Sequence, residues 1–222
     1  MFMKIAIRGG HCPKVPGASG ILNEVTEDRK VKDAVIKYLR QLGHQVYDVT
    51  PPDSMATSSG DLAHGVNEAN RLKVDIFASI HFNAFNGSAN GTEVCVYSPH
   101  DYAQRVVDNL TKLGFKYRGQ KVRTGLYELK NTSMKAMIVE VCFVDSSIDA
   151  EIYKRVGHDA VGKAIAEGIV NQKVPAPAPA PSNSTGYYRV VCGSFQNKNE
   201  AAQRQAKLKA AGFDSFLAYY EK

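Results

Sequence analysis

The chain has 222 residues, of which 44% are hydrophobic and 23% charged, a composition that favours a packed core with a small additional unit. It contains no apolar run of about 18 residues or more, so no transmembrane helix and no insertion into a membrane are predicted. The net charge is +6, and the four cysteines form no CxxC pair, which argues against a cysteine-zinc site and a disulfide framework.

Strand-like and helix-like patterns alternate along residues 1–172. Short apolar segments predict strands at 4–8, 45–49, 75–81, 92–97 and 137–144. Apolar residues at helical spacing predict helices at 24–42, 61–72, 101–113, 150–155 and 159–170, with Asp61 near an N-terminal cap. This alternation predicts an α/β domain with a mostly parallel, twisted sheet flanked by helices. In such sheets functional side chains gather at the carboxyl ends of the strands.

Residues 173–186 predict a linker, because proline alternates with alanine and a Ser/Asn/Gly stretch follows. Alternating proline fixes φ and removes amide donors, so the segment is expected to be an extended spacer. The sequence therefore predicts two domains, 1–172 and 187–222.

Residues 187–222 predict a small β-α-β module, with strands at 187–192 and 216–220 around a helix at 199–211. A unit of about 36 residues rarely folds alone, so it is expected to pair with a second copy as a homodimer. Residues 173–222 hold 7 Lys and Arg against 3 Asp and Glu. This basic excess suits an anionic partner or serves solubility. The aromatic residues Tyr187, Tyr188 and Phe195 show no RNA-binding signature, which disfavours nucleic acid as a partner.

Four polar residues stand where the pattern calls for apolar ones or for the end of an element. His11 follows the first predicted strand, Glu24 begins the first helix, His81 ends a strand, and Glu140 interrupts an apolar strand. Singly, each has an ordinary explanation, such as a hydrogen-bonded histidine, a helix-dipole partner or a buried ion pair. Together, two histidines and one glutamate match a catalytic zinc set, and a second glutamate matches the general base of a zinc hydrolase. The long-range spacing alone leaves both readings open.

The segments Ile-Arg-Gly-Gly-His11, Asn-Glu24, Ser-Ile-His81-Phe-Asn-Ala and Met-Ile-Val-Glu140-Val-Cys-Phe-Val-Asp resemble, in order, the zinc-dependent N-acetylmuramoyl-L-alanine amidases of autolysins and phage endolysins. The resemblance runs from about residue 3 to residue 171. It implies Zn²⁺ as cofactor, with His11, Glu24 and His81 as its ligands and Glu140 as the catalytic carboxylate. Asn83 either contacts substrate or caps a turn, and the turn is favoured.

The segment from Tyr188 to Phe216 resembles the opening half of a SPOR peptidoglycan-binding domain. The two resemblances together imply hydrolysis of the bond between N-acetylmuramic acid and L-alanine, with bacterial peptidoglycan as partner. A zinc peptidase acting on the stem peptide and a non-catalytic wall-binding protein are the alternatives. The first ten residues show no signal peptide. We therefore expect synthesis in the cytoplasm and action at the cell wall, reached by lysis, a holin pore or non-standard export.

Overall fold

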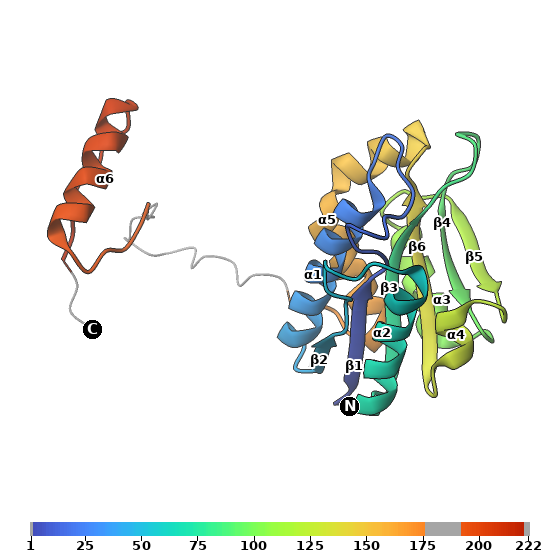
Figure 1. Cartoon of the computed structure of the whole chain (residues 1–222). Coiled ribbons are helices and arrows are strands. Elements are labelled where there is room, and N and C mark those ends of the chain that lie inside the picture. Colours follow the sequence, from blue (N-terminus) through green and yellow to red (C-terminus); the bar gives the residue numbers. More distant parts are fainter. Residues whose placement is uncertain (1, 176–191, 220–222) are drawn as a thin grey trace. The chain divides into compact units, whose positions relative to one another are not determined.

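The computed structural model describes residues 2–175 and 192–219, and the chain divides into two units, 1–175 and 176–222 (Figure 1). The predicted domain boundaries at 172 and 187 stay predictions. No helix within the described ranges is long and apolar enough to cross a membrane.

The first unit is built on a six-stranded sheet, in the spatial order β2-β1-β3-β6-β4-β5, within the described residues. β4 runs antiparallel to β6, whereas the other neighbouring strands of this sheet pair in parallel. This arrangement confirms the predicted α/β class. The strands are β1 (Lys4–Gly9), β2 (Gln45–Asp48), β3 (Ile76–Asn83), β4 (Thr92–Val96), β5 (Tyr117–Val122) and β6 (Lys135–Phe143).

Helices cover both faces of the sheet, as Figure 1 shows. The alternation of side chains along β1 explains this, since Ile5 and Ile7 enter the larger core while Ala6 enters the smaller one. The larger core lies under α1 (Glu24–Gln41), α3 (Asp101–Thr111) and α5 (Ser147–Val170). The smaller core lies under α2 (Ser58–Leu72) and the short α4 (Tyr127–Asn131).

The residues at the start of α1 determine where the helix begins, and this determines the position of Glu24. Asn23 is the N-cap, and its side chain accepts a hydrogen bond from the Thr26 amide (3.1 Å). Glu24 and Glu27 in the first turn complement the helix dipole. The helix is followed by Gly43, whose φ of 85° lies in the left-handed region that suits glycine after the end of a helix.

Several sequence predictions need correction. α2 begins three residues earlier than predicted, with Thr57 and not Asp61 as its cap. Asp61 is instead buried in an ion pair with Arg8 at 2.7 Å. β5 and α4 were not predicted, because their residues are mostly polar. The two predicted helices at 150–155 and 159–170 are confirmed, since α5 is interrupted at Gly157 by a non-helical backbone conformation (φ 79°, ψ 156°), although the first of them begins earlier, at Ser147.

Two histidines outside the candidate site, His44 and His100, are buried. The ring of His44 accepts a hydrogen bond from the Met3 amide (3.2 Å), and that of His100 caps α3 by accepting from the Ala103 amide (3.2 Å). The contact of His44 joins residues 41 positions apart, whereas the cap by His100 is local to the start of α3.

In the second unit, the described residues 192–219 contain α6 (Lys198–Ala210), which matches the predicted helix and has no buried residue. The described residues 213–219 form no strand, so the predicted strand at 216–220 is wrong as far as Tyr219. The predicted strand at 187–192 lies outside the described residues, apart from Cys192, which is not in a strand.

Candidate metal centre

Three strand ends and one helix start bring the predicted site residues together. His11 follows β1, His81 lies near the end of β3, and Glu140 lies in β6 as the register partner of His81. Because β1, β3 and β6 are adjacent and parallel, their carboxyl ends meet at one edge of the sheet. Glu24, the first residue of α1, reaches this edge through a hydrogen bond from the Phe82 amide to Glu24 Oε1 (2.9 Å).

One carboxylate oxygen stands between the two histidines. Glu24 Oε1 lies 3.5 Å from His11 Nε2 and 3.2 Å from His81 Nδ1. The two rings meet edge to face, with centroids 4.9 Å apart. The three side chains each offer a ligand atom within 4.8 Å of the others, the one such group among the described residues. This convergence is what a single metal ion requires.

Backbone contacts fix the orientation of these side chains. The Ala18 amide donates to Glu24 Oε2 (2.6 Å), and His11 Nδ1 lies 3.2 Å from the Val15 carbonyl oxygen. The Val15 carbonyl can only accept, so His11 Nδ1 carries the proton and Nε2 is left free towards Glu24. Burial opposes ionisation of Glu24, but in the metal-free chain the rings of His11 and His81 donate to it when they are protonated, and this holds the pKa of Glu24 well below its usual value.

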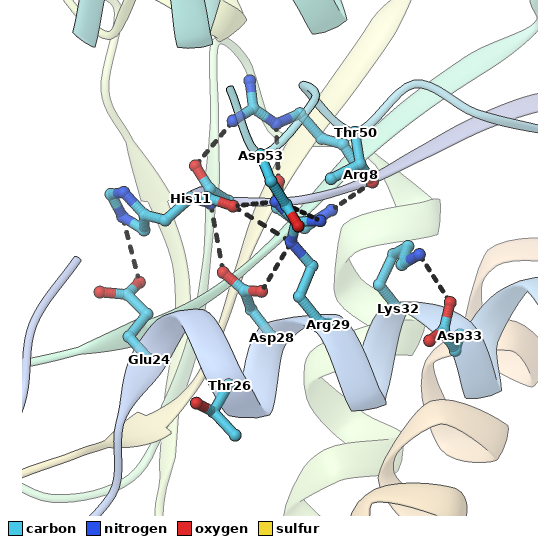
Figure 2. A network of polar contacts seen from close by, with 12 residues as sticks. Arg8, His11, Glu24, Thr26, Asp28, Arg29, Lys32, Asp33, Thr50 and Asp53 are labelled. Atoms are coloured by element: carbon cyan, nitrogen blue, oxygen red, sulfur yellow. Dashed lines mark hydrogen bonds and ion pairs between the residues drawn. The ribbon is translucent and has the colours of Figure 1, made fainter. Parts of the chain in front are cut away.

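Two side chains of α1 also bind the backbone of His11, as Figure 2 shows. The His11 amide donates to Asp28 Oδ2 (3.2 Å), and the Arg29 guanidinium donates to the His11 carbonyl (2.7 Å). Asp28 is fully buried, and burial raises its pKa to about 7. The loop that carries the first histidine is therefore anchored to the helix that carries Glu24.

Two glycines leave the room that the three side chains fill. A Cβ on Gly10 would overlap the His81 ring, and a Cβ on Gly17 would overlap Glu24 and the edge of His11. Any other residue at either position would displace one of these side chains. The chain thus leaves space for two histidines and one carboxylate, a set of donor atoms that could hold a metal ion.

Glu140 lies in the strand next to His81, one of the three converging residues. It is partly buried, and its Oε2 has no hydrogen-bond partner among the described residues. Burial raises its pKa to about 7; His81 opposes the shift, and the nearby carboxylates of Glu24, Glu93 and Glu128 add to it. A carboxyl that titrates near neutral pH is suited to accept and return a proton.

The structure places Asn83 in a turn contact and Cys12 away from solvent. Asn83 Oδ1 accepts from the Ala84 amide (2.9 Å), and Asn83 Nδ2 lies 3.4 Å from Glu93 Oε1. Its contact with substrate stays a prediction. Cys12 is fully buried and its thiol donates to the Met55 carbonyl (3.3 Å), while Cys95 and Cys142 are buried in strands.

Sequence reasoning missed a buried charged cluster behind His81. Arg8 of β1 pairs with Asp61 of α2 and with Glu128 of α4, and the side chains of all three are almost fully buried. Arg8 carries the same signal that identified Glu140, a charge inside an apolar strand. Glu128 carries no such signal, because it does not lie in a continuous apolar strand and its sequence gives no reason to expect burial.

Comparison with known proteins places this site in a family. Residues 5–171 match the family model of N-acetylmuramoyl-L-alanine amidases. The chain belongs to the N-acetylmuramoyl-L-alanine amidase family. A second family model, the SPOR domain, matches residues 162–219, from within α5 into the second unit.

Relatives of this amidase-family chain include an uncharacterized protein of Clostridium perfringens, 45% identical over 181 residues that cover 78% of the chain. The amidase CwlM of Bacillus licheniformis is 29% identical over 230 residues, covering 98% of the chain and 85% of the relative. The chain spans about half the length of two Clostridium perfringens relatives, 53% and 57%.

Solved structures of other proteins share the fold of the first unit. The catalytic domain of the CD27L endolysin, which targets Clostridia Difficile, superposes with a TM-score of 0.73 at 30% identity. The match covers 78% of this chain and 99% of that one. The amidase AmiC2 of Nostoc punctiforme gives a TM-score of 0.68 at 27% identity, covering 76% of this chain and 96% of that one.

Proposed function

We propose that this chain hydrolyses the amide bond between N-acetylmuramic acid and L-alanine in bacterial peptidoglycan, with a zinc ion held by His11, Glu24 and His81. The observation that carries the proposal is the position of Glu24 Oε1, 3.5 Å from one histidine nitrogen and 3.2 Å from the other, in a chain of this family. No other described group of His, Cys, Asp or Glu side chains converges in this way.

The donor set fits zinc in kind and in number. Imidazole nitrogen and carboxylate oxygen are zinc ligands, and catalytic zinc sites take three protein ligands and keep one position open. When bound, zinc supplies a Lewis acid that polarises an amide carbonyl and lowers the pKa of water. The deeply buried Glu24 carboxylate, held ionised by its histidine partners, provides the negative charge that such an ion requires.

Glu140 is proposed as the general base and acid. Its side chain projects from the strand next to His81, and its pKa of about 7 lets it take a proton from the attacking water and give it to the leaving amide nitrogen. Its unpartnered Oε2 leaves that oxygen free for this exchange within the described structure. Asn83, at the end of β3, is proposed only as a turn residue beside the site.

The second unit is proposed to bind peptidoglycan, on the strength of the SPOR match over residues 162–219. This role would hold the catalytic unit against an insoluble substrate and raise its local concentration. Pairing of residues 187–222 with a second copy stays a prediction, as does the route by which the protein reaches the wall.

Digestion of purified peptidoglycan with the full chain, followed by mass analysis of the products, tests the proposal. Free stem peptides that begin with L-alanine, lost on treatment with a chelator and restored by zinc, are the expected result. Cleavage within the stem peptide would instead establish a peptidase. Binding to the wall without any metal-dependent product would leave a wall-binding protein and overturn the catalytic roles.

A further inference from the structure

The far side of the His81 ring faces a second carboxylate. His81 Nδ1 points towards Glu24, so Nε2 points away from the three converging ligands. His81 Nε2 is buried and lies 3.7 Å from Glu128 Oε2, with no hydrogen-bond partner among the described residues. A buried ring nitrogen beside a buried carboxylate is a costly arrangement unless the two act on each other.

Glu128 is itself held by an arginine that is fixed on several sides. Arg8 Nη1 lies 3.0 Å from Glu128 Oε1, and Arg8 Nη2 donates to Asp61 Oδ2 (2.7 Å). Arg8 also donates to the backbone carbonyls of Asp61 (3.0 Å) and Gly10 (2.6 Å). Gly10 directly precedes His11, so one guanidinium contacts both the backbone beside the first histidine and the carboxylate behind the second.

We propose that Glu128 is a positioning residue for the metal site. Its carboxylate accepts a hydrogen bond from the protonated Nε2 of His81, which leaves His81 Nδ1 free to bind the metal. This inference rests on the proposed zinc site. A neutral imidazole carries one proton, and a metal-binding histidine usually donates it to a carboxylate or a backbone carbonyl. His81 would use the Glu128 carboxylate for this purpose.

His11 also has one ring nitrogen towards an acceptor and the other towards Glu24, but the two nitrogens have exchanged places relative to His81. Its Nδ1 faces the Val15 carbonyl at 3.2 Å, and its Nε2 faces Glu24. The two histidine ligands therefore bind through different nitrogens, His11 through Nε2 and His81 through Nδ1. Arg8 and Asp61 serve to keep Glu128 in place, since a buried carboxylate needs a charged partner.

A first test reads the protonated nitrogen directly in the unaltered full chain. Long-range proton–nitrogen NMR correlations on zinc-loaded protein with labelled histidine distinguish the two tautomers. The proposal predicts that His81 carries its proton on Nε2 and His11 on Nδ1. A zinc-loaded His81 with its proton on Nδ1 would overturn it.

A second test measures zinc affinity by competition with a chromophoric chelator in Glu128→Gln. Glutamine presents one acceptor oxygen, so it cannot accept from both Arg8 and His81. Zinc affinity should fall about 10- to 100-fold, the usual effect of losing such a partner. Glu68→Gln is the matched control, because Glu68 forms an ion pair with Arg71 on the surface of α2, and this variant should leave zinc affinity unchanged.

The outcomes separate this inference from the proposed function. If the wild type binds zinc and Glu128→Gln binds it equally well, the positioning role is wrong and the amidase proposal stands. If the wild type binds no zinc, both fail. If Glu128→Gln does not fold, the tautomer measurement on the wild type decides the question.

Discussion

His81 and Glu140 are register partners on the adjacent parallel strands β3 and β6. The His81 ring faces Glu24 in the candidate metal centre. The Glu140 carboxyl is partly buried, and its Oε2 has no hydrogen-bond partner within the described structure. The pairing matters because register in a buried sheet is tightly specified, and a slip by one residue would turn Glu140 to the other face. The sheet register therefore places the proposed base, Glu140, beside His81, a proposed metal ligand.

Replacing Glu140 with glutamine should separate catalysis from metal binding. The amide cannot exchange a proton, so turnover of muropeptides should fall by about 10²- to 10⁴-fold while zinc content stays at the wild-type level. Product mass analysis and metal analysis of the same samples check both parts. Glu151→Gln, an exposed position on α5, is the control. Near-normal turnover in Glu140→Gln would show that another group is the base.

Glu140 should also make the stability of the metal-free protein depend on pH. Burial raises its pKa from 4.5 to about 7, so the native state holds a proton that the unfolded chain releases between these values. The contribution of Glu140 to stability is therefore full below about pH 4.5 and is lost as the pH rises through about 7. The variant Glu140→Gln lacks this pH-dependent contribution to stability, because its amide does not titrate.

Urea unfolding of the metal-free wild type and of Glu140→Gln, at about pH 5 and about pH 8, measures this contribution. The free energy of unfolding of the wild type, relative to the variant, should fall by up to about 3 kcal/mol between the two conditions. A difference that stays constant with pH would mean that Glu140 titrates at its ordinary value.

Gly10→Ala should damage the site through packing alone. The added methyl group would occupy the space of the His81 ring, so the ring must move. We expect a loss of about 1–3 kcal/mol in stability, typical of overpacking, together with weaker zinc binding. Gly125→Ala is the control, since nothing lies near a Cβ at that position. Equal zinc affinity in the two variants would contradict this account of Gly10.

Ending the chain after Pro175 should separate wall binding from turnover. The cut belongs there and not after Gln172, because Val174 is buried, its amide donates to Glu167 (3.0 Å), and Lys173 pairs with the same carboxylate (2.7 Å). The shortened protein should keep its turnover of soluble muropeptides and lose affinity for intact walls in a pelleting assay. Equal loss of both activities would refute the proposed division of labour.

The sequence was sufficient to predict the α/β class, because the alternation of strand and helix patterns is a local signal. Polar residues at unexpected positions also singled out His11, Glu24, His81 and Glu140, but their proposed roles came from the resemblance to a family and not from their spacing. The sequence was not sufficient for the polar edge strand β5, which lacks an apolar pattern. The role of Asp61 was also missed, since its partner Arg8 lies 53 residues away. Long-range charge pairs of this kind decide where Glu128 lies, and no local pattern reports them.

The most direct measurement of the central claim is zinc titration of the chelated full chain during turnover of a soluble muropeptide. The account predicts that release of stem peptides beginning with L-alanine is absent at first, rises with added zinc and saturates at one ion per chain. Turnover that survives complete removal of metal, or that zinc fails to restore, would contradict it.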